Sequence, residues 1–195
     1  MAVNSKKGKR ELIIEAAVQV FSSKGYHNTR MEEIANVAGI GKGTIYEYFK
    51  SKLQLFQEML GDGLRVYYDN FDPENMEQMP VAERLRMIFE THIRFCRDHK
   101  DLTRILFWDT DVIDEELREW GYSMRQDKEG RILDIIKDGV ARGELRDVDL
   151  ALTKIIITGA IAATWAPITL DDWDVEPGLL ARNAVDILMN GIRAV

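Results

Sequence analysis

One stretch near the amino end, TRMEEIANVAGIGKGTIYEYFKSK at residues 29–52, limits the possible folds of this chain more than any other. Thr29 and Glu32 stand in the register of a capping box, which predicts a helix that begins at Arg30. Gly39 supplies the backbone freedom that ends this helix and turns the chain. A second short helix follows at once, so the stretch has the pattern of a helix-turn-helix.

The second short helix is predicted from Lys42 to about Phe49 and has only two side chains suited to a core, Ile45 and Phe49. The other side chains include hydroxyl groups, a cation and a carboxylate, and a helix this short buries little. We therefore expect them to contact something outside the chain. A second capping-box pattern opens at Ser51 and starts the next helix at Lys52.

The sequence from about Arg10 to Phe56 resembles the DNA-binding segment of the TetR family of bacterial transcriptional repressors. The residues that carry this resemblance include Gly-Lys-Gly-Thr-Ile-Tyr at 41–46, then Tyr48-Phe49 and Lys52. The resemblance implies that the start of the second short helix faces bases and phosphates, while neighbouring residues hold the phosphate backbone. The implied DNA contacts are Thr29, Lys42, Gly43, Thr44, Tyr46, Tyr48 and Lys52. Glu47 occupies a position that varies in the family, where an acidic group reads a cytosine amino group or points to solvent.

Charge is distributed unevenly along the chain, whose net charge is −7. Residues 1–52 carry nine Lys or Arg against five Asp or Glu, whereas residues 53–195 carry 17 against 28. Neutralising phosphate takes cations, so DNA binding fits the basic segment and not the acidic remainder. We therefore expect a helix-turn-helix DNA-binding domain at 1–52 and a helical effector-binding and dimerisation domain at 53–195.

Apolar residues recur with a helical period over most of the chain, and no stretch alternates convincingly with the period of a strand. An apolar content of 46% and a charged content of 30% fit a soluble globular protein. The expected fold is all-α, with about nine helices. They are predicted at about 9–24, 30–38, 42–49, 52–68, 81–99, 101–108, 114–142, 148–165 and 177–193.

The fourth of these helices, at 52–68, starts inside the DNA-binding segment. We expect it to transmit movement between the DNA-binding domain, called the head, and the remaining helical domain, called the body. Gly61 and Gly63 each lower its helix propensity by about 1 kcal/mol relative to alanine. They mark either a flexible point or close packing against a neighbouring helix. In the expected mechanism, an effector shifts this helix and changes the spacing of two DNA-binding heads.

The segment at 148–165 is apolar almost all round, so it must be covered on most sides. The resemblance implies that the last two helices pack against their copies as a four-helix bundle. A symmetric homodimer would then place two heads on the two half-sites of a palindromic operator in double-stranded DNA. The alternative is a monomer that buries both helices internally.

Aromatic and methionine residues are numerous in the centre of the body, as in a cavity for a hydrophobic effector. The candidate effector-binding residues are His92, Trp108, Trp120, Met124 and Trp165. For each of these residues the alternative to effector binding is burial in the hydrophobic core. For His92 that alternative is a hydrogen-bonded core histidine. Residues 177–192, with Trp165, faintly resemble repressors that respond to long-chain acyl-CoA. The expected effector is therefore an acyl-CoA or another apolar compound.

No catalytic residue, cofactor or metal is predicted, because the three histidines lie far apart and no nucleophile, phosphate-loop or metalloprotease signature occurs. Acidic clusters at 109–116 and 171–176 offer ligands for Mg²⁺ or Ca²⁺, but carboxylates that favour helix N-termini are the simpler interpretation. The single Cys96 excludes an internal disulfide and suits a reducing cytosol. The alternative function is a helical adaptor that binds protein and has no DNA affinity.

A membrane role is not expected either. The longest mostly apolar run, Ile155 to Ile168, contains two threonines, a glycine and a proline and is shorter than the ~20 residues that a membrane span needs. We therefore expect a cytoplasmic protein without a membrane partner.

Overall fold

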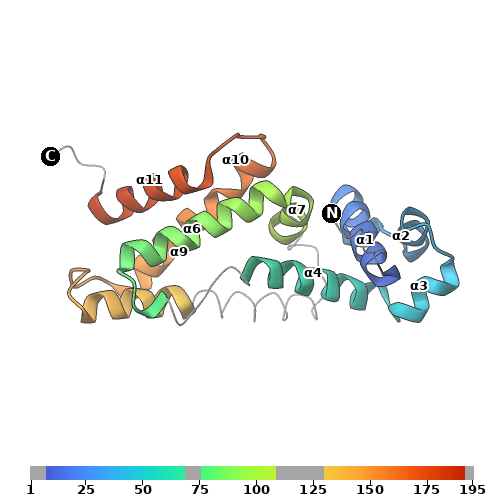
Figure 1. The fold of residues 1–195 in the computed structure, drawn as a ribbon, viewed down its shortest axis with the longest axis horizontal. Helices are drawn as coiled ribbons and strands as arrows, with labels where there is room; N and C mark the ends of the chain where they lie inside the picture. Colours follow the sequence, from blue (N-terminus) through green and yellow to red (C-terminus); the bar gives the residue numbers. More distant parts are fainter. Residues whose placement is uncertain (1–7, 69–75, 109–129, 192–195) are drawn as a thin grey trace, which may run out of the picture. The chain divides into compact units, whose positions relative to one another are not determined.

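The structure is a computed structural model that describes residues 8–68, 76–108 and 130–191 of the chain. Within these ranges every regular element is a helix, as Figure 1 shows, which confirms the predicted all-α fold. The chain divides into two compact units. We call Met1–Val66 with Asp101–Leu117 the head unit, and Tyr67–Lys100 with Arg118–Val195 the body unit. The contacts group residues 53–66 with the head, and the functional boundary at residue 52 stays a prediction.

The head unit is built from three amino-terminal helices, one long and two short, and parts of two further ones. They are α1 (Lys9–Asn28), α2 (Met31–Val37), α3 (Lys42–Tyr48), α4 (Lys52–Tyr68) and α7 (Lys100–Trp108). α2 packs against both α1 and α3. The large side chains that are fully buried here include Ile13, Phe21, Ile34, Ile45, Phe49 and Phe56. One apolar core therefore fixes how α3 is presented.

Two glycines with positive φ break the helices of the head at the positions where the sequence predicts an end, although α1 continues past the first of them to Asn28. Gly25 has a φ of 75° and interrupts α1 near its end. Gly39 has a φ of 69° and follows α2. The N–H of Ile40 donates to the carbonyl of Ala35 at 3.0 Å, which closes the turn in the manner of a Schellman motif. These bonds direct the chain into α3, which begins at Lys42 as predicted.

The start of α2 lies one residue later than predicted. The N–H of Arg30 donates to the carboxylate of Glu33 at 3.0 Å, so the capping interaction uses this pair. The hydroxyl of Thr29 donates instead to the carbonyl of Gly25 at 2.8 Å. The predicted capping box of Thr29 and Glu32 is therefore wrong. The chain leaves α1 at this point, and the threonine hydroxyl takes the place of a backbone donor.

The start of α4 is confirmed at Lys52. The hydroxyl of Ser51 accepts the N–H of Gln54 at 3.0 Å, and the side chain of Gln54 accepts the N–H of Lys50 at 2.8 Å. This reciprocal arrangement separates α3 from α4 within a few residues.

The two glycines of α4 have different surroundings. A Cβ at Gly63 would collide with the side chain of Leu102 on α7, whereas a Cβ at Gly61 would meet nothing within 4 Å. Close packing against a neighbouring helix therefore accounts for Gly63. Of the two predicted alternatives, the flexible point remains open only for Gly61.

The body unit contains α6 (Val81–Asp98), α9 (Leu150–Ala163), α10 (Trp165–Thr169), α11 (Pro177–Asn190) and a helix at 130–141. α6 packs against α10 and α11 (Figure 1). α11 ends before the predicted position because Gly191 has a φ of 78°. The beginning of the helix predicted at 114–142 lies outside the described residues. The core of this unit includes Val81, Leu85, Phe89, Ile93, Ile132, Ile136, Ile157, Ile168 and Val185.

A buried arginine joins the start of α6 to the helix at 130–141. The guanidinium of Arg84 donates to the carbonyls of Met79 and Glu77 at 2.8 and 2.7 Å and pairs with Asp138 at 2.5 Å. The hydrogen bond from Arg84 also lowers the pKa of the Asp138 carboxyl group. These bonds satisfy a charge that would be costly to bury alone.

α9 and α10 together form a 20-residue apolar stretch, Leu150–Thr169, that could cross a membrane by length and composition. This corrects the prediction that the apolar run here is too short, because the helical stretch begins before Ile155 and Thr164 keeps helical angles at the junction. Ile157 and Ile161 face the core of the body unit, whereas Ile155 is 61% exposed. α9 therefore has one covered and one uncovered apolar face.

Candidate nucleic-acid interface

α3 presents an exposed face built on two buried anchors. Ile45 and Phe49 are fully buried, as predicted, and they fix how the helix is turned against the core. The phenol side chains of Tyr46 and Tyr48 are 38% and 41% exposed. Of the remaining predicted contacts on α3, Lys42 and Gly43 are exposed and Thr44 is half-buried.

The first turn of α3 is poorly suited to helix stability. It starts with Lys42 and Gly43, contains no acidic residue, and has no side-chain cap at Gly41. The helix dipole disfavours a cation at this end, and glycine costs about 1 kcal/mol relative to alanine. A Cβ at Gly43 would meet nothing within 4 Å, so no packing contact in the described part of the chain requires glycine. Lys42 and Gly43 therefore do little for the stability of α3, and they allow an external partner to come close to its backbone.

Lys42 is paired across the turn of the motif. Its ammonium group lies 2.6 Å from the carboxylate of Glu32 on α2, and the two side chains are 66% and 43% exposed. The hydrogen bond from Lys42 lowers the pKa of the Glu32 carboxyl group, and Glu32 raises the pKa of Lys42. Both groups are therefore charged at neutral pH, and Lys42 remains on a surface that an external anion can approach.

Lys52 and Thr29 are turned into the head, unlike the predicted contacts on α3. The ammonium of Lys52 donates to the carbonyls of Tyr26, Thr29 and His27 at 2.7, 3.0 and 3.4 Å. It also lies 4.4 Å from the centre of the Tyr26 ring. Burial lowers the pKa of Lys52, but three hydrogen bonds to carbonyls require its protonated form. Thr29 is only 2% exposed. Both residues therefore hold the end of α1 in place.

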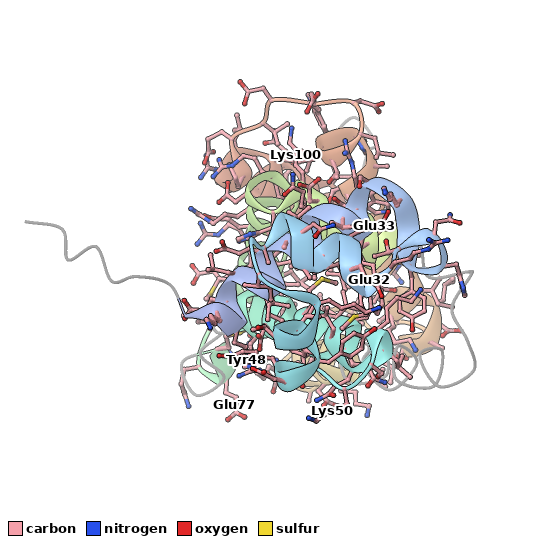
Figure 2. All side chains as sticks on the ribbon, turned by 90° about the vertical axis from the view of Figure 1, so that its right-hand side faces the viewer. Glu32, Glu33, Tyr48, Lys50, Glu77 and Lys100 are labelled. Atoms are coloured by element: carbon pink, nitrogen blue, oxygen red, sulfur yellow. The ribbon has the colours of Figure 1, made fainter. Side chains whose placement is uncertain are left out.

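Two exposed cations were absent from the predicted set. Arg30 precedes α2, and Lys50 follows α3, where its ammonium donates a long hydrogen bond, 3.5 Å, to the carbonyl of Tyr46. In Figure 2, Tyr48 and Lys50 lie on the same lower side of the head, away from Glu33. The sequence signal for Lys50 is its place between the buried Phe49 and the cap of α4. At that position its side chain cannot pack into the apolar core with α3 or α4, so it points to solvent.

The predicted effector-binding residues are only partly described. His92 is buried on α6, with its Nε2 atom 3.5 Å from the Sγ atom of Cys96. Trp165 is half-buried and packs against the core of the body unit. The side chain of Trp108, and Trp120 and Met124 entirely, lie outside the described residues. His92 thus has the surroundings of a core histidine, and the pocket stays a prediction.

A groove on the body unit lies elsewhere, between α6 and α11. Its lining includes Glu83, Arg86, Arg182, Val185, Asp186 and Met189. None of the five predicted effector-binding residues contributes to it. The groove therefore gives no support to that set.

The acidic cluster at 171–176 has structural roles. The carboxylate of Asp172 pairs with Lys100. Glu176 accepts the N–H of Gly178 at 3.0 Å at the start of α11, which agrees with the interpretation as a helix cap. Within the described ranges no three His, Cys, Asp or Glu side chains are arranged to hold a metal ion. The cluster at 109–116 lies outside them.

Comparison with known families gives two matches along the chain. Residues 13–59 match the model of bacterial regulatory proteins of the tetR family. Residues 78–166 match the model of the tetracyclin repressor-like C-terminal domain. The first match contains all of α2 and α3, and the second runs from the segment before α6 to the start of α10.

Individual relatives are similar over most of their length. The chain is 28% identical to the fatty acid metabolism regulator protein of Bacillus subtilis over 97% of this chain and 98% of that protein. It is 27% identical to the transcriptional repressor KstR2 of Mycolicibacterium smegmatis over 80% of this chain and 78% of that protein.

A solved structure extends the likeness to the fold. The regulator FadR from Bacillus subtilis, in complex with stearoyl-CoA, aligns with a TM-score of 0.79 and 23% identity over 94% of this chain and 99% of that chain. An exposed α3 on a three-helix head, followed by a matching helical body, agrees with both family models. The chain therefore belongs to the TetR family of bacterial regulatory proteins.

Proposed function

We propose that the chain is a homodimeric transcriptional repressor that binds a palindromic operator through α3 and is released by an acyl-CoA or a similar apolar effector. The observation that carries the DNA-binding part is the exposed face of α3. It combines the phenols of Tyr46 and Tyr48 with a hydroxyl group and a cation in the first turn, and that turn is poorly suited to helix stability. These are the groups that contact phosphate oxygens and base edges.

Individual contacts follow from position on the head. Lys42 and Thr44 open α3 and would reach base edges, with Gly43 allowing the backbone to come close. Tyr46, Tyr48 and Lys50 would hold phosphates. Thr29 and Lys52 would act indirectly, because both bind carbonyl groups near the end of α1. The proposed division separates residues that touch DNA from residues that hold the head in shape.

The uncovered apolar face of the body suits a second copy of the chain. Leu152, Ile155 and Ile156 on α9 and Leu179 and Ile187 on α11 are all about half exposed or more. α9 also carries Lys154 and Thr158 and buries its other face in protein, which suits a lipid-surrounded span poorly. A symmetric four-helix interface would cover the aliphatic residues and hold two heads at a fixed separation.

The effector is proposed from the relatives. One relative is named a fatty acid metabolism regulator, and the FadR structure contains stearoyl-CoA. An acyl chain would occupy an apolar cavity in the body, near His92 and Trp165, with Trp108, Trp120 and Met124 as further candidates. Binding would shift α4 and change the spacing of the heads, at a coupling free energy of about 1 to 3 kcal/mol.

The family consists of transcriptional regulators, and we propose no catalytic activity for this chain. A regulator of this kind acts on chromosomal DNA, so we propose a cytoplasmic location. The competing function, an adaptor that binds protein through α3, predicts no affinity for DNA that depends on salt.

The test measures DNA binding and its response to the effector. Fluorescence anisotropy with a duplex from upstream of the protein's own coding region should show affinity that falls as salt rises. Stearoyl-CoA should release the duplex, and free coenzyme A should not. Absence of binding at low salt would favour the adaptor. Binding that ignores stearoyl-CoA would retain the DNA function and remove the proposed effector.

A further inference from the structure

The cation that opens α3 is already held by a carboxylate of the same chain. Glu32, on α2, lies 2.6 Å from the ammonium of Lys42. The two residues belong to the two helices of the helix-turn-helix, so their pair bridges the turn. Whatever approaches Lys42 along the exposed face of α3 therefore meets Glu32 as well.

The neighbouring carboxylate has a different task. Glu33 pairs with Lys24 at 2.6 Å and also accepts the N–H of Arg30 at 3.0 Å, which caps α2. Glu32 is bonded to Lys42 and to its own backbone N–H, and it caps no other residue in the contacts that the structure describes. Glu32→Gln keeps an oxygen acceptor for that N–H, so it should leave α2 intact, and its main effect should be on Lys42.

The ammonium group of Lys42 cannot bind a DNA phosphate and the carboxylate of Glu32 at full strength at the same time. When a phosphate or a base oxygen binds the ammonium, the bond to Glu32 weakens, and the carboxylate is left beside the negative charge of the duplex. Both changes oppose binding. We infer that Glu32 is a positioning residue that holds Lys42 in the free head and competes with DNA for it. This inference rests on the proposed function, in which α3 binds DNA.

The expected effect concerns affinity for DNA of any sequence. An exposed pair contributes modestly, so Glu32→Gln should raise affinity for a mixed-sequence duplex by about two- to fivefold at low salt. The gain should shrink as salt increases, because salt screens both the pair and the repulsion. Competition of this kind would keep the protein from remaining on non-specific DNA.

The experiment uses the full chain and a fluorescein-labelled duplex of mixed sequence, with anisotropy measured over a series of salt concentrations. Glu33→Gln is the matched control, since it removes one negative charge from the next position and keeps an acceptor for Arg30. Lys42→Met, alone and combined with Glu32→Gln, completes a double-mutant cycle. Glu32→Ala removes the same charge by a second route, and thermal unfolding checks that each variant folds.

The inference requires that Glu32→Gln raises affinity more than Glu33→Gln does, and that the excess is smaller in the Lys42→Met background, where only the direct repulsion between Glu32 and the duplex remains. An equal rise for both glutamine variants would indicate a general charge effect and overturn it. An excess that is undiminished without Lys42 would overturn it as well. If the unaltered protein shows no salt-dependent DNA affinity, the proposed function fails, which is a separate outcome from failure of the Glu32 competition.

Discussion

The exposed face of α3 in the head and the exposed face of α9 and α11 in the body are both uncovered within the described chain, and their chemistry is opposite. The face of α3 carries phenols, a hydroxyl group and a lysine. The face of α9 and α11 carries leucine and isoleucine. Amphipathic side chains tolerate water and bind polar partners, whereas aliphatic clusters lower their free energy by leaving water. We expect both faces to be interfaces, and their side-chain chemistry favours DNA as the partner of α3 and a second copy of the chain as the partner of α9 and α11.

The largest effect is expected from a charge placed on the aliphatic face. Ile155→Glu would bury an unpaired carboxylate in the proposed dimer, at a cost of at least about 3 kcal/mol, or more than ~100-fold in the dimer dissociation constant. Sedimentation equilibrium measures that constant. Simultaneous binding to two half-sites should be lost with the dimer.

Ala141→Glu is the control for this variant, because Ala141 is exposed at the end of the helix at 130–141 and away from α9 and α11 in sequence. It should leave the dimer intact. A dimer that survives Ile155→Glu would break the comparison, since the aliphatic face would then need a different partner.

The second prediction contrasts two lysines two positions apart. Lys52→Met removes three hydrogen bonds to carbonyls and should lower the free energy of unfolding by about 1 to 3 kcal/mol. Lys50→Met should leave stability unchanged, weaken binding to all DNA sequences, and reduce the salt slope by roughly 0.9. Urea unfolding and anisotropy measure the two quantities. Equal stability loss in both variants would contradict the assignment.

The two lysines also show how far the sequence determines the candidate site. The buried anchors Ile45 and Phe49 follow from their spacing, and the kink in α1 and the end of α2 follow from Gly25 and Gly39. The direction of the Lys52 side chain does not, because a lysine at a helix start reaches either solvent or nearby carbonyls with the same local sequence. Which direction it takes depends on α1, whose end lies over 20 positions earlier in the chain.

The hydrogen-bond partners at the end of α1 could not be predicted from the sequence for the same reason. Thr29 fits a capping box by register, and the structure gives the cap to Glu33, one residue beyond the predicted Glu32. The kink at Gly25 made a carbonyl available to the threonine hydroxyl. Local pattern therefore predicted most of the described helices and their order, although one predicted helix at 148–165 is observed as α9 and α10. The choice between competing acceptors required the fold.

The third prediction concerns the contact of α4 with α7. Gly63→Ala should destabilise the protein by about 1 to 3 kcal/mol, because the added methyl group collides with the side chain of Leu102. Thermal or urea unfolding measures the loss. Gly63→Ala should lower DNA affinity only through stability, since Gly63 is buried and offers no surface to a partner. Unchanged stability would show that Leu102 moves aside at no cost.

The smallest change in stability is expected at Gly43, and it tests the face of α3 most directly. Gly43→Ala and Gly61→Ala both add a methyl group to a helix where nothing lies within 4 Å. Each should stabilise the protein by about 0.5 to 1 kcal/mol, because alanine is the better helix former. Gly61 is therefore a matched control for the conformational effect.

Only Gly43 lies on the exposed first turn of α3, so only Gly43→Ala should weaken DNA binding, by several-fold, while it stabilises the fold. Opposite signs in urea unfolding and anisotropy would mean that glycine is kept there for the approach of DNA to the backbone. If Gly43→Ala strengthened both stability and binding, the opening turn of α3 would not lie against the duplex. The amphipathic face of α3 would then have to meet its partner farther along, at Tyr46 and Tyr48.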